Sequence, residues 1–257
     1  MPRLTVTIIT RDEAANIGAA LSSVAWADEI VVVDSGSTDE TVAIARQHTP
    51  CVFVREWPGF AAQKNWAAEK AAHDWILSID ADERVTPALA GEIRRTLASE
   101  PGPRGFQIPR VSRYLGRWLR STDWYPDYQL RLYDRRAARW GGSHVHEGVE
   151  VRGDVGRLRE ELQHLPYRDI SHHLQTIDRY TTLAARQMHE RGRRVTPGAL
   201  VFRPAGAFAR NYVLRGGWRD GSLGLVVSVL NSYYVFLKFA KLWALQRTGG
   251  EDGPADN

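Results

Sequence analysis

The stretch WILSIDADE, residues 75–83, joins a run of strand-forming residues to a cluster of acids. Three similar apolar runs precede it: LTVTII (4–9), IVVV (30–33) and CVFV (51–54). Short runs rich in β-branched residues predict strands, and strands that are apolar throughout are typical of a parallel sheet buried on both faces. We therefore expect an α/β fold in which a mainly parallel sheet is covered by helices on both sides.

The segments between these runs carry signals for helix starts. Ser37 and Glu40 form a capping box, which predicts a helix that begins there. Thr86 as the cap and Pro87 at the first helical position predict another helix. Right-handed crossovers between parallel strands place the carboxyl ends of the strands along one edge of the sheet, where ligands bind in open sheets of this kind.

Charge separates the two halves of the chain. The first 100 residues carry 9 basic and 15 acidic side chains, and the remainder carries 25 basic and 15 acidic ones, for a net charge of +4. Arginines interleaved with aromatic residues suit either a nucleic acid or an anionic membrane surface. Because no nucleic-acid-binding motif is present, we expect a membrane surface and no nucleic acid as the partner.

The last apolar stretch bears on whether the chain spans a membrane or lies on its surface. Residues 221–237 are 17 uncharged residues, fewer than the about 20 that span a bilayer comfortably. On a helix, Asn231, Lys238 and Lys241 share one side, which predicts an amphipathic helix over 223–245 with a basic face. A buried core helix is the alternative interpretation of the same segment.

Two features bear on the cellular compartment. Cys51 is the single cysteine, which excludes an intrachain disulfide framework. The opening residues MPRLTVTIIT lack the apolar stretch of a secretory signal. We expect a cytoplasmic protein that sits peripherally on the inner face of the cell membrane.

Three acids lie at predicted strand ends: Asp34, Asp80 and Asp82. Two aspartates separated by one residue after an apolar strand can face a common hard cation, and Mg²⁺ or Mn²⁺ often bridges such carboxylates to substrate phosphates. A solvated loop would also contain such a pair. An aspartyl phosphatase places its DxD after the first strand of the domain rather than the fourth, and a dinucleotide oxidoreductase is disfavoured because no GxGxxG follows the first strand.

Three ordered motifs carry a resemblance to a known family. The motifs TVTIITRDEAANI (5–17), EIVVVDSGSTDET (29–41) and QKNWAAEKAAHDWILSIDADE (63–83) resemble the nucleotide-sugar domain of family 2 inverting glycosyltransferases. The resemblance continues through WYPDYQLRLYDRR, HVHEGV and RGGWRDGSLGL, so it covers nearly the whole chain. This longer pattern is similar to the bacterial branch that adds glucose or a related hexose to the inner core of lipopolysaccharide.

The resemblance implies a fold and a division of the chain. The fold is the GT-A type, with a Rossmann-like, mainly parallel sheet. Residues 1–165 would form the glycosyltransferase domain, with a nucleotide-sugar half (1–100) and an acceptor half (101–165). A helical, membrane-associated region would follow over 166–247, and residues 248–257 would be a disordered tail.

The resemblance also implies roles for single residues. Those expected to contact the nucleotide sugar are Thr10, Glu13, Asp34, Lys64, Asn65 and Asp80. Independently of the resemblance, we expect Arg131 to assist at the leaving diphosphate, with a structural ion pair as the alternative. Asp80 and Asp82 would hold the metal, with His164 as a further ligand; a structural histidine is the alternative for His164. The family usually has asparagine where Asp12 stands, so an amide that can donate hydrogen bonds is replaced by a carboxylate that only accepts them.

An inverting transferase needs a base that takes the proton of the acceptor hydroxyl. Glu147, in HVHEG after Gly141 and Gly142, is the first candidate, and Asp127 is the second. The expected reaction moves a hexose from a nucleotide sugar, with UDP-glucose as the best guess, to a lipid-linked or lipopolysaccharide-core acceptor. The alternative is a membrane-tethered nucleotide-sugar binding protein without activity.

Overall fold

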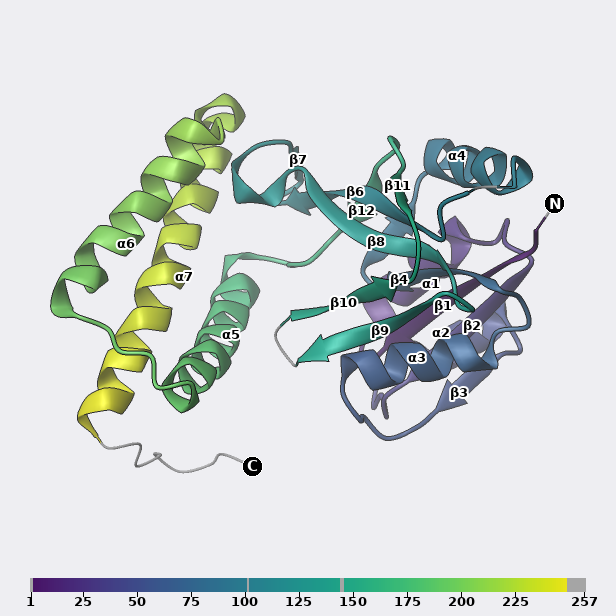
Figure 1. The fold of residues 1–257 in the computed structure, drawn as a ribbon, viewed down its shortest axis with the longest axis horizontal. Helices are drawn as coiled ribbons and strands as arrows, with labels where there is room; N and C mark the ends of the chain where they lie inside the picture. Colours follow the sequence, from purple (N-terminus) through teal and green to yellow (C-terminus); the bar gives the residue numbers. More distant parts are fainter. Residues whose placement is uncertain (1, 101, 144–145, 249–257) are drawn as a thin grey trace. The chain divides into compact units, whose positions relative to one another are not determined.

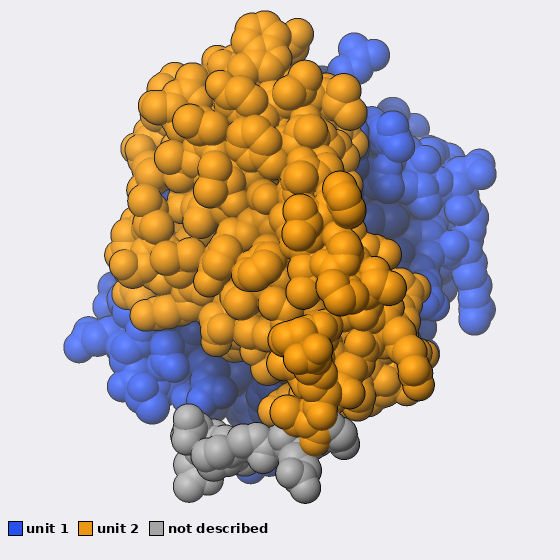
Figure 2. Space-filling view, turned by 90° about the vertical axis from the view of Figure 1, so that its left-hand side faces the viewer, with its two compact units in different colours: residues 1–112, 126–166 blue, residues 113–125, 167–257 orange. Residues whose placement is uncertain are grey.

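The chain consists of two compact units. The computed structural model describes residues 2–100, 102–143 and 146–248, and leaves out the side chains of Ser143, His146 and Glu147. One unit comprises residues 1–112 and 126–166, and the other comprises residues 113–125 and 167–257 (Figures 1 and 2). The segment 113–125, which we expected in the glycosyltransferase domain, therefore belongs to the same unit as the late helices. One reason is a backbone hydrogen bond of 3.1 Å from Thr122 N to Arg215 O.

Four parallel strands form one side of the large sheet in the first unit, in the order β3-β2-β1-β4 (Figure 1). They are β1 (Leu4–Thr10), β2 (Glu29–Asp34), β3 (Val52–Val54) and β4 (Trp75–Asp80). Each coincides with one of the four apolar runs, so the expected parallel sheet is confirmed. The carboxyl ends of β1, β2 and β4 bring Thr10, Asp34 and Asp80 to one edge.

The sheet continues beyond β4 in the order β8-β6-β12-β5. These strands are β8 (Asp127–Asp134), β6 (Gly105–Tyr114), β12 (Leu162–His164) and β5 (Glu83–Val85). Strand β8 runs antiparallel to both β4 and β6. Two short strands, β7 (Arg117–Leu119) and β11 (Val155–Arg157), also pair with β6, and β9 (Ala138–Ser143) with β10 (His146–Val151) forms a separate hairpin.

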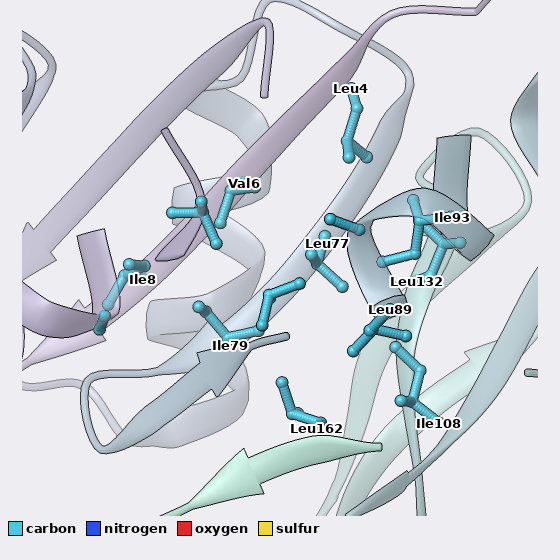
Figure 3. Packing of buried hydrophobic residues seen from close by; sticks show 14 of the residues in the cluster. Leu4, Val6, Ile8, Leu77, Ile79, Leu89, Ile93, Ile108, Leu132 and Leu162 are labelled. Atoms are coloured by element: carbon cyan, nitrogen blue, oxygen red, sulfur yellow. The ribbon is translucent and has the colours of Figure 1, made fainter. Parts of the chain in front are cut away.

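Helices cover both faces of the sheet. Leu4, Val6 and Ile8 of β1 point into a core shared with α1 (Ala14–Ser23), α2 (Thr41–His48) and α4 (Pro87–Ala98) (Figure 3). The alternate residue Ile9 packs instead with Ala67 of α3 (Phe60–Lys70) on the other face. Successive side chains of a strand point to opposite faces, so every residue of β1 is buried, Thr5 and Thr7 included.

The two predicted helix starts have different outcomes. Thr86 caps α4, because its Oγ1 accepts a hydrogen bond of 3.1 Å from Leu89 N. The capping box at Ser37 and Glu40 is wrong: α2 begins at Thr41 without a side-chain cap. The Ser37 hydroxyl instead donates to the Asp34 carboxylate, and its oxygen accepts from Asp12 N at 2.8 Å rather than from the start of a helix.

Three helices build most of the second unit: α5 (Ile170–Glu190), α6 (Pro197–Ala209) and α7 (Gly221–Arg247). Short turns complete it: η1 (Thr122–Trp124), η2 (Arg210–Leu214) and η3 (Gly217–Asp220). By length and composition alone, Gly217–Arg247 is long and apolar enough to cross a membrane.

The expected basic face of the last helix is wrong. Lys241 of α7 turns inward and donates to Asp178 O at 2.6 Å and to the hydroxyl of Thr182 at 2.7 Å, both on α5. Asn231 likewise bonds Asn211 within the unit. The helix instead exposes an apolar stripe, which contains Leu225, Val229, Tyr233 and Phe236.

Candidate active site

Two loops at the carboxyl edge of the sheet are tied together by Asp12. Its backbone lies in the left-handed region, with φ of 52°. Its N–H donates to Ser37 Oγ at 2.8 Å, and its Oδ1 accepts from Thr38 N at 2.8 Å. Asparagine and aspartate both tolerate this backbone and both offer an accepting side-chain oxygen. The aspartate at this position therefore supplies the acceptor that an asparagine would supply.

Asp34 ends β2 with a carboxylate that is almost completely buried. Its Oδ1 accepts from Gly36 N at 2.9 Å and from Ser37 N at 2.8 Å, and its Oδ2 accepts from Ser37 Oγ. Gly36 has φ of +82°, which a glycine adopts at little cost. Asp34 thus holds the turn after β2 in shape, in addition to any contact it makes with a ligand.

Two buried polar atoms near this edge have no hydrogen-bond partner among the described residues. They are Thr10 Oγ1 and Gln63 Oε1. Gln63 is fully buried in α3, and its Nε2 donates to Ser35 Oγ at 3.1 Å. A buried polar atom without a partner costs about 1–3 kcal/mol, and among the described residues Thr7 Oγ1 and Arg131 Nε share this property. Gln63 was missed from the sequence because a glutamine in a helix is usually exposed.

Six charged side chains of alternating sign form a connected chain below the edge. In order they are Lys64, Asp80, Arg131, Glu83, Arg110 and Asp127. They come from α3 and from four different strands of the sheet. Three cations balance three anions, so this set of six side chains is neutral. Buried charges are tolerated when they are paired in this way.

Arg131 stands at the centre of this ion network. Its Nη2 donates to Asp80 Oδ2 at 2.6 Å and to Glu83 Oε1 at 2.7 Å. Burial lowers the pKa of Arg131, but the two carboxylates outweigh burial and raise it above its usual value. Glu83 is 0% exposed and also accepts from Arg110 Nη1 at 3.0 Å and from Asp80 N at 3.0 Å. A buried glutamate is thus shared by two guanidinium groups.

Asp80 and Lys64 form the end of the network that reaches the sheet edge. Asp80 Oδ1 lies 2.8 Å from Lys64 Nζ, and the Asp80 side chain keeps 30% of its exposure. Burial alone would raise the pKa of Asp80, but the Arg131 and Lys64 charges hold it well below its usual value. Burial lowers the pKa of Lys64, and the Asp80 charge opposes this. Lys64 Nζ also lies 4.3 Å from the centre of the Trp140 ring.

Asp82 and His164 come together as the metal prediction requires. Asp82 Oδ2 lies 3.3 Å from His164 Nε2, and both side chains are partly exposed. The other ring nitrogen of His164, Nδ1, lies 3.1 Å from Ser112 Oγ, which orients the ring. An outer hydrogen bond of this kind is typical of histidines that ligate metals.

Asp80 does not join that pair. Both of its carboxylate oxygens are bonded to Lys64 and Arg131. Within the described part of the chain, no three histidine, cysteine or acidic side chains are placed to hold one metal ion. Asp80 thus pairs with two cations, and the expectation that Asp80 and Asp82 share a metal stays a prediction.

Other predicted site residues are engaged in the fold. Asn65 donates to Trp140 O at 2.8 Å and accepts from Trp140 N at 2.9 Å, so it fastens α3 to β9. Asp127 accepts from Arg110 Nη2 at 2.6 Å and from Gln129 Nε2 at 2.6 Å. Glu13 accepts from Asn16 Nδ2 at 2.7 Å at the start of α1.

Glu147, the first candidate for the base, lies on β10, where its backbone pairs with Gly142 of β9. Its side chain lies outside the described part of the structure. Its role as the base therefore stays a prediction.

Replacing Glu83 by glutamine tests what the ion network contributes. Glu83→Gln keeps the shape of the side chain but leaves Arg110 and Arg131 facing each other without the charge between them. We expect the free energy of unfolding, measured by urea denaturation, to fall by about 3–5 kcal/mol. Glu69→Gln, an exposed glutamate of α3, should change it by less than about 0.5 kcal/mol. Equal unfolding midpoints for the wild type and Glu83→Gln would show that the network does not stabilise the fold.

Comparison with known proteins places the chain in a family. Residues 5–150 match the family described as Glycosyl transferase family 2. The lipopolysaccharide core biosynthesis glycosyltransferase LpsC of Rhizobium meliloti is 34% identical over 93% of this chain and 92% of its own length. An uncharacterized glycosyltransferase of Rickettsia felis is 30% identical over 94% of this chain and 90% of its own length.

Among solved structures, glucosyl-3-phosphoglycerate synthase from Mycobacterium tuberculosis is 23% identical over 44% of each chain, with a TM-score of 0.38. That similarity is too low to assign a ligand. The family match and the two curated relatives agree with the motifs at the strand ends. The chain therefore belongs to glycosyltransferase family 2 and is a glycosyltransferase.

Proposed function

We propose that this protein is an inverting hexosyltransferase that moves a sugar, with glucose the first candidate, from a UDP-sugar to a lipid-linked or lipopolysaccharide-core acceptor. The observation that carries this proposal is the similarity to LpsC, a lipopolysaccharide core glycosyltransferase, which extends over nearly the whole of both chains. The choice of UDP-glucose rests on the motif resemblance alone.

The carboxyl edge of the sheet supports the donor site. Thr10 Oγ1 and Gln63 Oε1 are buried polar atoms that a nucleoside would satisfy. Asp34 and Glu13 lie at the ends of the two loops that border these atoms. Asp80 offers a partly exposed carboxylate for the ribose hydroxyls, and its bonds to Lys64 and Arg131 fix its position. Asn65 has both amide groups on Trp140, so we assign it a supporting role.

The residues present fit a divalent cation. Asp82 Oδ2 and His164 Nε2 are 3.3 Å apart, and the Ser112 contact at Nδ1 orients the imidazole so that Nε2 faces Asp82. Mg²⁺ or Mn²⁺ held by one or two side chains takes its other ligands from water and substrate phosphates. When bound, the metal would neutralise the charge that grows on the leaving diphosphate.

The transfer itself requires one proton acceptor. The acceptor oxygen forms a bond to the anomeric carbon while the bond from that carbon to the diphosphate oxygen breaks. The electron pair of the breaking bond leaves with the diphosphate, and the hydroxyl proton passes to a carboxylate. We assign this role to Glu147, because both oxygens of Asp127 already accept hydrogen bonds, from Arg110 and Gln129.

A substitution at Asp82 tests the donor and the metal together. A panel of nucleotide sugars, each with and without Mn²⁺, should raise the thermal unfolding midpoint of the wild type, and UDP-glucose with Mn²⁺ should raise it most. Asp82→Ala should keep the midpoint of the free protein, lose the metal-dependent part of the rise and abolish transfer. Asp154→Ala, an exposed acid, should behave as the wild type does. Metal-dependent stabilisation in Asp82→Ala would contradict the assignment.

A pair of isosteric variants identifies the base. In Glu147→Gln the proton acceptor is lost and the shape is kept, so donor binding should persist while kcat falls by about 10²–10⁴. Asp127→Asn should keep most of the wild-type kcat. The measurements are single-turnover transfer rates and donor affinity for each variant. Should Glu147→Gln retain full turnover while Asp127→Asn loses it, the base is Asp127.

The second unit supports attachment to the inner face of the membrane. Apolar side chains that are more than half exposed gather on α6 and the turns that follow it: Val201, Phe202, Val213, Leu214 and Trp218. Exposed arginines lie among them: Arg203, Arg210, Arg215 and Arg219. We call these nine residues the apolar–basic surface. Apolar groups that enter the lipid and cations that meet anionic headgroups act together at a membrane surface.

Vesicle binding tests this attachment. The protein should bind vesicles of anionic phospholipid at low salt, and high salt should weaken the binding without abolishing it, since apolar contacts do not depend on charge. Phe202→Ser with Leu214→Ser should weaken binding at least tenfold, because each side chain contributes roughly 1.5–3 kcal/mol when buried. Val54→Ser with Val155→Ser, two exposed apolar residues of the first unit, is the matched control. Equal binding by the two double variants would exclude this surface as the anchor.

A further inference from the structure

The second unit contains a cavity of about 310 Å³ whose walls are mainly aromatic. Five ring side chains line it: Trp124, Tyr167, His173, Tyr180 and Tyr234. Ligand pockets usually have volumes of about 300–1,000 Å³, so this cavity is suited to a small ring rather than to a whole lipid chain. None of the described side chains that line it is an acid, a lysine or an arginine.

The one titratable base in the lining is neutral. Burial, with a smaller contribution from the charge of His172, lowers the pKa of His173 to about 4. Its Nδ1 lies 3.0 Å from Tyr114 Oη, and its ring stacks on Tyr167 with 4.0 Å between the ring centres. The nearest cations lie behind two lining rings: Lys238 Nζ is 5.4 Å from the ring centre of Tyr234, and the Arg179 guanidinium is 5.4 Å from that of Tyr180. The lining itself offers ring faces and hydrogen bonds rather than charge, which suits an uncharged ligand.

A fixed amide supplies hydrogen bonds at the cavity wall. Asn231 Oδ1 accepts from Trp124 Nε1 at 3.1 Å, and its Nδ2 donates to Asn211 Oδ1 at 2.8 Å. An amide carries two donor hydrogens and two accepting lone pairs, so Asn231 has capacity left for a ligand. A hydrocarbon chain would leave that capacity unused.

The network behind the amide holds it in place. Asn211 is fully buried in the π-helical turn η2, where it also accepts from Asp123 N at 2.9 Å and donates to Ala207 O at 3.0 Å. Turns of this type occur frequently at functional sites. A polar group whose orientation is set before binding loses less entropy when a ligand arrives.

We propose that this cavity binds a neutral sugar ring of the acceptor saccharide; the inference rests on the proposed function. A pyranose has an apolar C–H face that packs on aromatic rings and hydroxyls at its rim that pair with an amide. The hydroxyls of Tyr180 and Tyr234, on α5 and α7, are further polar groups of the lining. The acceptor would therefore carry at least one uncharged pyranose.

Binding of simple glycosides tests the cavity without a donor. Methyl glucoside, methyl mannoside and methyl galactoside should bind the full chain in saturation-transfer NMR. Methyl glucuronide, which differs from methyl glucoside by one carboxylate, should bind at least tenfold more weakly. Equal binding of the glucoside and the glucuronide would overturn the proposal.

A neighbouring pair of tyrosines provides the control. Tyr234→Phe removes one hydroxyl from the lining and should weaken glycoside binding about fivefold, the effect of one hydrogen bond of about 1 kcal/mol. Tyr233, the preceding residue of α7, is 41% exposed and lies outside the lining. The Tyr233→Phe variant should therefore bind glycosides as the wild type does. Thr176→Val is a second lining variant with the same expectation as Tyr234→Phe. If neither lining variant alters binding, the cavity is not the sugar site.

Transfer kinetics separate this inference from the proposed function. Tyr234→Phe should raise the acceptor KM about fivefold and leave kcat unchanged, because a contact made equally in the ground and transition states affects KM alone. If the wild type transfers a hexose but no neutral glycoside binds, the cavity proposal fails and the function stands. If neutral glycosides bind but no hexose is transferred to any saccharide acceptor, the function fails and the cavity remains a sugar site.

Discussion

The guanidinium group of Arg131 between Asp80 and Glu83 is the interaction on which the first unit depends. It lies on β8, and its partners lie at the end of β4 and on β5, so three strands that are distant in sequence meet at one charge. Breaking a buried pair costs more than the pair itself contributes, because the remaining charge has no partner. The position of Asp80, and with it the start of the turn that carries Asp82, is thus coupled to the antiparallel half of the sheet.

Much of the parallel half of the fold could be predicted, whereas the strand pairing of the antiparallel half could not. The four apolar runs identify β1 to β4, since strands covered on both faces are rich in β-branched and apolar residues and carry no charge in their middle. Glu83 and Arg110 were missed because their partners come from strands whose pairing is not local. An acid after a DxD motif and an arginine in a strand have no sequence pattern that distinguishes a buried pair from a solvated one. The helix start at Ser37 failed for a related reason, since the Ser37 oxygen accepts from Asp12 N, which lies on another loop.

The same contrast applies to the candidate site: the positions of its acids could be predicted, and their partners could not. The sequence places Asp34, Asp80 and Asp82 at strand ends, and the structure brings all three to one edge of the sheet. It could not show that Asp80 pairs with Lys64 and Arg131, or that Asp82 lies beside His164. In the second unit, the helical pattern of 223–245 identified the apolar residues of α7 but not which side is covered. The covered side of α7 is the one that packs against α5, where Lys241 donates hydrogen bonds.

The π-helical turn η2 restricts how the second unit can vary in length. Helix α6 runs directly into η2 at Arg210, so each residue between Pro197 and Asn211 sets the direction in which Asn211 points. Adding or removing one residue there would rotate Asn211 by about 100° and separate it from Asn231. A whole helical turn would restore the direction but would shift Asn211 by about 5.4 Å along the axis, so a change of length in this helix breaks the pairing in either case. Among relatives, length differences should be excluded from this helix and should gather in the connection that precedes it.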